Sequence, residues 1–385
     1  MEQEERDGNR VKTGGRILLI RPREPGGREN SRLLRVLREG LADICLQEVT
    51  EVSQLEMMTD QTGRLAPEGW QGRLLVLFVI DLGEHGINLE YTRLLGWLRS
   101  HPGSLDGWTG GVVADADSDL YTKSAARELV FTANSSGCAF VGRPLVEGTK
   151  TLSNFAIVAS NLGTDLYGAY VESVKMLAEQ LTGREEQGKG DGKELLVLHA
   201  SSHKNSNTYA VWQGVRQYLQ DFSITEIGLR NGTLADCSGC PYKMCLHFGE
   251  RGSCFYGGVM VEDVYPAVRK ADGILLLAPN YNDALSANLT AFINRLTALF
   301  RTTRFYDKKL FGIVVSGYSG SDLIAEQMIA ALNMNKTFYL PGHFAMLETA
   351  NHPGEAMKLP GIEERMKQYA EHIRRNMGEA KLYRP

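Results

Sequence analysis

Two series of short apolar runs, each alternating with stretches of helical periodicity, constrain the fold of this chain more than any other feature. The runs cover residues 17–20, 74–80, 111–114 and 138–141 in the first half, and 195–198, 273–278, 312–316 and 337–340 in the second. Short apolar runs that alternate with amphipathic helices are typical of parallel strands covered on both faces. The pattern therefore predicts an α/β chain with two doubly wound parallel sheets.

The two halves look like copies of one unit. Ile17 corresponds to Leu195, 178 residues later, whereas Leu74 corresponds to Ile274, 200 residues later. This increase indicates an insertion between the first and third strands of the second half. A unit of about 180 residues is longer than a solenoid repeat, so it indicates a duplicated domain.

A polar, glycine-rich stretch at residues 183–193 separates the two series and is interpreted as a linker. We therefore expect one domain at residues 15–182 and another at 194–385, with residues 1–14 forming a loose or disordered N-terminus. The periodicity of the second half predicts a helix from Leu285 to Phe300, for which Ser286 can serve as the N-cap.

Charge and hydropathy exclude several classes of protein. The 42 Lys and Arg residues against 46 Asp and Glu residues give a formal charge of -4, which does not favour nucleic acid or an anionic membrane as a partner. The longest apolar run is far shorter than the roughly 20 residues that span a bilayer. The charged N-terminus does not resemble a signal peptide, so we expect a cytoplasmic protein with reduced cysteines.

Three loops that follow strands of the second half carry small, amide and aromatic side chains. The first, residues 199–208, leads into a helix and can offer N–H groups and hydroxyls to a phosphate at the helix N-terminus. The same residues can instead simply cap the helix. The other two, residues 278–286 and 316–321, follow the third and fourth strands. Ligands of open parallel sheets bind at the carboxyl ends of the strands, where these loops converge.

This set of loops resembles that of the flavodoxin-like NAD(P)H-dependent FMN reductases, over roughly residues 193–376. The resemblance implies two tandem flavodoxin-like domains of strand order 2-1-3-4-5, with FMN as cofactor and NAD(P)H as electron donor. It further implies phosphate contacts from Ser201, His203, Ser206, Asn207 and Thr208, and contacts to the isoalloxazine ring from Pro279, Asn280, Tyr281, Asn282, Ser316, Gly317, Tyr318, Ser319 and Gly320.

Four of the six cysteines lie in the insertion, in the pattern Cys237-x2-Cys240-x4-Cys245-x8-Cys254. Four thiolates within reach of one point suit either an iron–sulfur cluster or a tetrahedral zinc ion. The segment also resembles the four-cysteine motif of iron–sulfur flavoproteins, whose cluster exchanges electrons with FMN. This resemblance implies a 4Fe–4S cluster on the four cysteines, with zinc and free thiols as the alternatives.

The remaining cysteines, Cys45 and Cys138, each lie in a strand-like apolar stretch. Small cysteines are common in buried strands, so we expect both to be buried and to have no chemical role.

The corresponding loops of the first half differ in composition. Two prolines remove backbone donors from its first loop, and the other two loops carry five carboxylates, on Asp81, Glu84, Asp115, Asp117 and Asp119. We therefore expect this copy not to bind FMN. It is interpreted either as a stabilising domain or as an internal pseudo-dimer partner that shapes the substrate side of the flavin site, and a homodimer is a further option.

The leading functional hypothesis is an FMN-dependent oxidoreductase that passes electrons between FMN and the cysteine-ligated cluster. One alternative is an NAD(P)H-dependent FMN or quinone reductase without a cluster. A non-enzymatic FMN-binding electron carrier or sensor is the other. In each case the partners are small-molecule or protein electron donors and acceptors, and no side chain stands out as a general acid or base.

Overall fold

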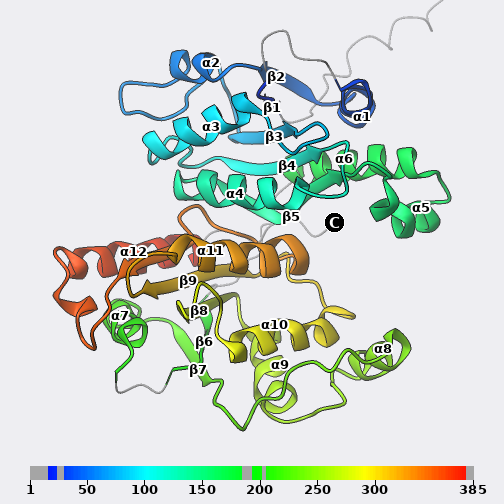
Figure 1. The fold of residues 1–385 in the computed structure, drawn as a ribbon. Coiled ribbons are helices and arrows are strands. Elements are labelled where there is room, and N and C mark those ends of the chain that lie inside the picture. The colour runs from blue at the N-terminus through cyan, green and yellow to red at the C-terminus, as the bar shows by residue number, and fades with distance from the viewer. Residues whose placement is uncertain (1–15, 24–29, 184–192, 202–204, 379–385) are drawn as a thin grey trace, which may run out of the picture. The chain divides into compact units, whose positions relative to one another are not determined.

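The computed structural model describes residues 16–23, 30–183, 193–201 and 205–378. The chain divides into two compact units, one formed by residues 1–126 and 145–183 and the other by residues 127–144 and 184–385. Figure 1 shows that each unit is built around a sheet with helices packed on it. The predicted N-terminal tail, residues 1–14, and most of the predicted linker, residues 184–192, lie outside the described residues.

The first sheet has five strands in the order β2-β1-β3-β4-β5, which is the predicted flavodoxin-like order 2-1-3-4-5. Its strands are β1 (Arg16–Ile20), β2 (Cys45–Val49), β3 (Leu75–Asp81), β4 (Thr109–Asp115) and β5 (Ala139–Gly148). The helices are α1 (Ser31–Gly40), α2 (Val52–Met57), α3 (Leu89–Ser100), α4 (Thr122–Ser135), α5 (Ala156–Leu162) and α6 (Leu166–Thr182). The central strand β3 is buried over six of its seven residues, as expected of a strand covered on both faces.

The second sheet has the same topology, in the order β7-β6-β8-β9-β10. Its strands are β6 (Glu194–His199), β7 (Ser223–Gly228), β8 (Gly273–Pro279), β9 (Lys309–Ser316) and β10 (Ala345–Thr349). The helices are α7 (Asn207–Arg216), α8 (Tyr242–Glu250), α9 (Tyr265–Lys270), α10 (Ala287–Phe300), α11 (Ser321–Met328) and α12 (Ile362–Gly378). The predicted fold class is therefore confirmed for both sheets.

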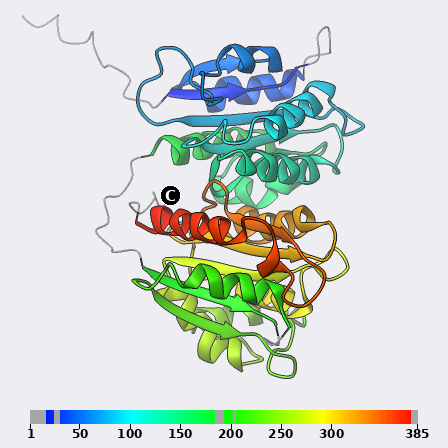
Figure 2. The ribbon, with the colours of Figure 1, turned by 90° about the vertical axis from the view of Figure 1, so that its left-hand side faces the viewer.

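One face of the second sheet is covered by α7 and α12, which lie side by side in Figure 2. Trp212 of α7 and Ile373 of α12 are fully buried against strand residues such as Val197 and Phe311. Each strand alternates its side chains between two faces, so the other residues of these strands pack under the helices of the opposite face.

The predicted helix of residues 285–300 is confirmed as α10. The Ser286 hydroxyl caps it by accepting a hydrogen bond from the backbone N–H of Leu289, at 3.4 Å. A serine at this position satisfies one of the N–H groups that a helix start leaves unpaired. Side chains of α10 also hydrogen-bond to the segment that contains the four cysteines.

The prediction of a strand at residues 337–340 is wrong. This stretch forms only isolated bridges, between Tyr339 and Lys309 and between Leu340 and Phe140. The fifth strand is β10, residues 345–349, where buried and more exposed residues alternate. An edge strand such as this has one neighbour, so its sequence alternates instead of forming a continuous apolar run.

The expectation that Cys45 is buried is also wrong, because it lies exposed on β2. Strand β2 is at the edge of the first sheet, and four of its five residues are not buried. Cys138 is fully buried as expected, and burial raises the pKa of its thiol well above the ordinary value.

Candidate functional site

The carboxyl ends of the strands in the second sheet meet at one edge. His199 of β6 pairs with Leu277 of β8, and Pro279 of β8 pairs with Val315 of β9. Ser316, the last residue of β9, pairs with Thr349 of β10. The loops that were predicted to bind a flavin therefore leave the sheet at the same level.

The loop after β6 leads into the N-terminus of α7. Ser206 is the N-cap of this helix, because its hydroxyl accepts a hydrogen bond from the N–H of Tyr209 at 3.2 Å. Thr208 is buried within the first turn. His203 lies outside the described residues, so its predicted phosphate contact stays a prediction.

Ser201 has the most informative environment in this loop. Its side chain is 9% exposed, and its hydroxyl oxygen is buried without a hydrogen-bond partner among the described residues. A buried hydroxyl without a partner costs on the order of 1–3 kcal/mol. A phosphate oxygen near the start of α7 would supply an acceptor for this hydroxyl and would also face the positive end of the helix dipole.

The side chain of Asn207 bonds within the protein, so its predicted phosphate contact stays a prediction for the backbone N–H. Its side-chain amide donates to the carbonyl oxygens of Ala350 and His352, at 3.2 and 2.8 Å, and its Oδ1 accepts from the N–H of Ala356. The side chain thus ties the start of α7 to the segment after β10. Only the backbone N–H of Asn207 is left to serve the predicted phosphate contact.

The loop after β8 forms a tight turn. The backbones of Tyr281 and Ala284 pair with each other, and Asn282 and Asp283 between them have φ angles of 54° and 58°. Two consecutive positive φ values are typical of a type I′ turn, which Asn and Asp tolerate better than most residues. The turn leaves the Tyr281 side chain 54% exposed at the edge of the sheet.

Asn280 connects this turn to the loop after β9. Its Nδ2 donates to the carbonyl oxygen of Ser319 at 3.0 Å and to Asp283 at 3.1 Å, while its Oδ1 accepts from the N–H of Asp283. Gly320 closes the same junction with a φ of 84°, and a Cβ there would come within 2.5 Å of Asp283 Oδ1. The close approach of the two loops therefore requires glycine at this position.

The loop after β9 contains the other predicted ring contacts. Ser316 is fully buried and accepts a hydrogen bond from the Ser321 hydroxyl at 2.8 Å. Gly317 and Ser319 follow it, and Tyr318 between them is 81% exposed. The predicted residues Pro279 to Asn282 and Ser316 to Gly320 therefore lie on two adjacent loops.

The segment after β10 belongs to the same edge, although the sequence analysis did not include it. Asn351 donates from its Nδ2 to the hydroxyl oxygen of Tyr318 at 2.7 Å. Glu355 accepts the backbone N–H groups of Asn351 and His352, both at 2.7 Å. The signal for this segment is an Asn-His-Pro-Gly turn directly after the fifth strand, which the misplaced strand at residues 337–340 concealed.

A second group that the sequence analysis missed is the pair His199 and Glu226, on the neighbouring strands β6 and β7. His199 Nε2 lies 3.5 Å from Glu226 Oε1, and Glu226 also accepts hydrogen bonds from Tyr209 and Trp212, each at 3.0 Å. The hydrogen bond to His199, followed by those to Trp212 and Tyr209, lowers the pKa of Glu226 to about 2. Through its bonds to Tyr209 and Trp212, Glu226 ties α7 to β7 beside the strand that leads into the Ser201 loop.

The cysteine segment is held against α10 by three side chains of that helix. Asn288 donates to the carbonyl oxygen of Leu229 at 2.7 Å, and Asn294 donates to Asp236 at 3.0 Å. Arg295 is 2% exposed and donates to the carbonyl oxygens of Ala235 and Gly257, at 3.4 and 2.7 Å. These bonds fix both ends of the segment that contains the four cysteines.

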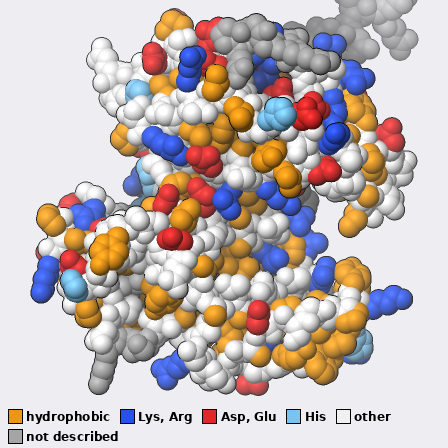
Figure 3. All heavy atoms as spheres, in the orientation of Figure 1, with side chains coloured by type: hydrophobic (Ala, Val, Ile, Leu, Met, Phe, Trp, Pro, Cys, Tyr) orange, Lys and Arg blue, Asp and Glu red, His pale blue; other side chains and the backbone are white. Residues whose placement is uncertain are grey.

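Helix α8 also packs closely on α10. A Cβ on Gly249 would come within 2.6 Å of the carbonyl oxygen of Ala298, so a side chain there would force the helices apart. The aromatic side chains Tyr242, Phe255 and Tyr256, in and after α8, are exposed. Figure 3 shows hydrophobic side chains gathered over α8 and the adjoining surface.

All four cysteines line one cavity of about 350 Å³ between this segment and α10. Phe248, Arg295 and Arg301 contribute to the same lining. No three His, Cys, Asp or Glu side chains of the described residues are grouped closely enough to hold a metal ion. The cysteines therefore share a cavity without being arranged as the ligands of one metal centre.

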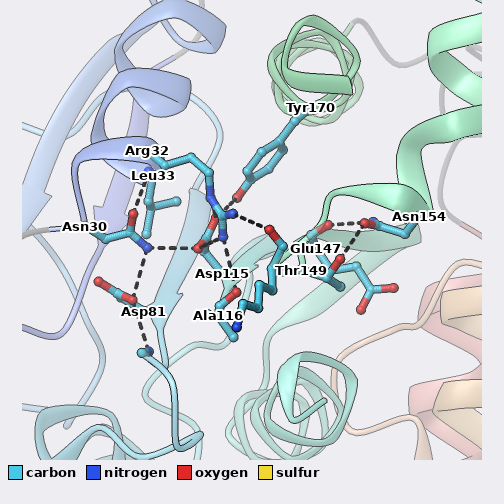
Figure 4. A network of polar contacts seen from close by, with 12 residues as sticks. Asn30, Arg32, Leu33, Asp81, Asp115, Ala116, Glu147, Thr149, Asn154 and Tyr170 are labelled. Carbon is cyan, nitrogen blue, oxygen red and sulfur yellow. Dashed lines mark hydrogen bonds and ion pairs between the residues drawn. The ribbon is translucent and has the colours of Figure 1, made fainter. Parts of the chain in front are cut away.

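The corresponding edge of the first sheet is filled by its own side chains, as Figure 4 shows. Asp115, fully buried at the end of β4, accepts hydrogen bonds from Arg32 at 2.6 Å, from Asn30 at 2.8 Å and from Tyr170 at 3.1 Å. Asn30 is also the N-cap of α1 and donates to Asp81. Desolvation raises the pKa of Asp115 despite these donors.

This network places a carboxylate of the protein beside the start of α1, whereas the loop before α7 in the second unit has the Ser201 hydroxyl, for which the described residues supply no partner. The Arg32 guanidinium is directed at Asp115 and is therefore occupied by an internal anion. That the first copy does not bind FMN stays a prediction, which FMN titration can test.

No helix of the described residues is long and apolar enough to cross a membrane.

Comparison with solved structures finds similar chains at low identity. An NAD(P)H:quinone oxidoreductase from Methanothermobacter marburgensis is 15% identical, with a TM-score of 0.36 over 49% of this chain and 98% of that chain. An azoreductase from Bacillus anthracis str. Sterne is 14% identical, with a TM-score of 0.35 over 48% of this chain and 98% of that chain. An FMN-dependent NADH-azoreductase from Bacillus anthracis str. Ames Ancestor is 11% identical, with a TM-score of 0.32 over 46% and 98% of the two chains.

The chain matches no curated protein. A family model, however, matches residues 194–352, which begin at β6 and end in the segment after β10. These residues contain the three predicted loops, the added Asn351 segment and the four cysteines. The second unit therefore contains, at residues 194–352, an oxidoreductase domain of the NADPH-dependent FMN reductase family.

Proposed function

We propose that the second unit binds FMN at the carboxyl edge of β6, β8 and β9 and acts as an NAD(P)H-dependent reductase of flavin, quinone or a related acceptor. FMN held by these loops would supply hydride-transfer chemistry between NAD(P)H and the acceptor. The observation that carries the proposal is the buried Ser201 hydroxyl, which has no hydrogen-bond partner in the described part of the chain, in the loop that leads to the N-terminus of α7.

In this proposal the chain itself binds and orients. The Ser201 hydroxyl and the first N–H groups of α7 hold the phosphate, because both are donors at the positive end of the helix. The turn at Tyr281 and the loop at Gly317 to Gly320 form the ring site. Asn280 keeps these two loops in register through its bond to Ser319.

Titration of the full-length protein with FMN, followed by flavin fluorescence, tests the binding step. We expect Ser201→Ala to raise the FMN dissociation constant about tenfold or more, because one hydrogen bond to a charged group is lost. Ser173→Ala is the matched control, since this serine bonds to a backbone carbonyl within α6 of the first unit. Equal affinities of all three proteins would contradict the proposed phosphate site.

The catalytic step is tested by NADH and NADPH oxidation with a soluble quinone as acceptor and FMN present. Sustained turnover that depends on FMN supports a reductase. FMN binding without turnover with either nicotinamide would favour an electron carrier or sensor instead.

A second candidate adds a cysteine-ligated cluster that exchanges electrons with FMN. Its support is that the four cysteines line the same cavity, beside the buried cationic side chain of Arg295. A cluster with four thiolate ligands is anionic, so a buried guanidinium is a suitable neighbour for it.

Anaerobic purification followed by visible spectroscopy and by iron, sulfide and zinc analysis tests this second candidate. A cluster predicts stoichiometric iron and sulfide that are lost in Cys240→Ser and retained in Cys45→Ser, whose cysteine lies exposed in the first unit. FMN-loaded protein that contains neither iron nor sulfide would contradict the cluster and would support the reductase without one.

A further inference from the structure

A second polar cavity, of about 430 Å³, lies at the end of α10 that is farther from the flavin edge. Its lining combines three cationic residues, one carboxylate and three hydroxyl side chains, namely Arg269, Lys308, Arg304, Asp307, Thr302, Thr303 and Tyr306. Arg269 lies in the last turn of α9, and the other lining residues lie between α10 and β9, so the cavity is at the amino edge of the second sheet.

Cationic side chains also gather around the adjacent Phe300. Arg304, Arg143 and Lys336 lie 4.4, 5.3 and 5.5 Å from the centre of its ring. Arg143 belongs to the part of β5 that is assigned to the second unit. Arg301, the next residue along, has a buried Nε without a hydrogen-bond partner among the described residues.

The charges of this group are not balanced within the described part of the chain. No ion pair of the described residues involves Arg143, Arg301, Arg304 or Lys336, each of which lies over an aromatic ring instead. Burial, followed by the proximity of Arg143 and Arg301, lowers the pKa of Lys336 from its ordinary value. Like charges held together in a partly buried place repel one another, and a bound anion would relieve that repulsion.

The chemistry of the lining restricts the kind of anion. Guanidinium groups bind phosphate through paired N–H donors, and Thr and Tyr hydroxyls add single donors to the remaining oxygens. A cavity of this volume accommodates a small molecule. The net charge of -4 on the whole chain does not favour a nucleic-acid backbone as the occupant.

We propose that this cavity is a second ligand site, in which Arg269 and Arg304, with the hydroxyls of Thr303 and Tyr306, bind a phosphate-bearing small molecule. Lys336 and Arg143 add charge from the Phe300 side. The site is separate from the proposed flavin site, because α10 has its N-terminus at the flavin edge and Phe300 at the other end. Fourteen residues at about 1.5 Å each separate the two sites by about 20 Å.

The test uses the full-length protein with saturating FMN, so that the flavin site is not available to the probe. Pyrophosphate binding is measured by calorimetry at low and at physiological salt for the wild type, Arg304→Gln and Lys336→Gln. Lys367→Gln, which removes an exposed cation on α12, is the matched control. Circular dichroism and thermal unfolding establish that each variant is folded.

We expect saturable pyrophosphate binding by the wild type and the control, at least tenfold weaker binding by Arg304→Gln, and a smaller loss for Lys336→Gln. If Arg304→Gln does not fold, Lys336→Gln decides the same question. No binding by the wild type, or binding that all variants share, would overturn the site. Inorganic phosphate and a nucleoside diphosphate as further probes then distinguish a free-phosphate site from one for a larger phosphorylated molecule.

Discussion

Asn280 Nδ2 donates a hydrogen bond to the carbonyl oxygen of Ser319, 3.0 Å away, and so joins the loop after β8 to the loop after β9. The same amide group also holds Asp283 within its own turn. The shape of the proposed flavin site therefore depends on one side chain that connects two strand ends.

Replacement of Asn280 tests this dependence. We expect Asn280→Ala to raise the FMN dissociation constant about tenfold, because the two loops lose their shared donor. The measurement is FMN titration, with Asn335→Ala as control, since Asn335 bonds only to the carbonyl oxygen of Ala330. An unchanged FMN affinity in Asn280→Ala would show that flavin binding does not depend on the bond between these two loops.

Glu226 gives a prediction for pH. Its pKa is lowered to about 2 in the folded protein, below the ordinary value of 4.5. A carboxyl group with a lowered pKa stabilises the folded state above the ordinary value, and this contribution is lost as the pH falls from about 4.5 to about 2.

We therefore expect wild-type protein to lose about 1–2 kcal/mol more unfolding free energy than Glu226→Gln over that range, after allowance for solvent screening. Urea unfolding at a series of pH values measures the difference. Glu262→Gln, at an exposed position, should follow the wild type. Parallel pH profiles for wild type and Glu226→Gln would show that the His199 pair has no such effect.

Arg295 is expected to hold the cysteine segment in place whether or not a cluster binds. Arg295→Met removes the donors to Ala235 and Gly257, and we expect faster proteolysis within residues 237–254 and a loss of about 2–3 kcal/mol in stability. Arg375→Met, at an exposed position on α12, is the control. Limited proteolysis that does not distinguish the two variants would contradict the proposed clamp.

We expect replacement of Asp115 to lower the stability of the first unit and to leave FMN affinity unchanged. Asp115→Asn leaves Arg32 without its carboxylate partner, and breaking a buried ion pair costs about 3–5 kcal/mol. Thermal unfolding measures the loss, and Asp119→Asn, at an exposed position, is the control. We expect the FMN affinity of both variants to equal that of the wild type, and a loss of affinity in Asp115→Asn would assign the first unit a part in the flavin site.

The sequence was sufficient to predict the two sheets, because buried central strands such as β3 and β8 form continuous apolar runs. The same criterion did not identify the edge strand of the second sheet. Residues 337–340 are all buried and mostly apolar, but they pair only in isolated bridges. The true edge strand includes Glu348, which forms a two-point ion pair with Arg365. Edge strands carry polar residues on one face, so apolar content alone does not identify them.

The sequence predicts which loops form the candidate site, but it does not predict the long-range hydrogen bonds that connect them. His199 and Glu226 come together through the register of β6 and β7, in which Val197 pairs with Glu226, and periodicity does not fix that register. The side chain of Asn207 bonds to the carbonyl oxygen of His352, 145 residues away, and a motif does not predict such a partner. Long-range partners of this kind follow from the folded topology.

The most direct test of the account is the stoichiometry of FMN binding by the purified full-length protein. Asp115 and Arg32 fill the helix start of the first unit, whereas the Ser201 hydroxyl of the second has no hydrogen-bond partner among the described residues, so we expect one FMN per chain. Two FMN per chain, or none under conditions in which the protein is folded, would contradict it.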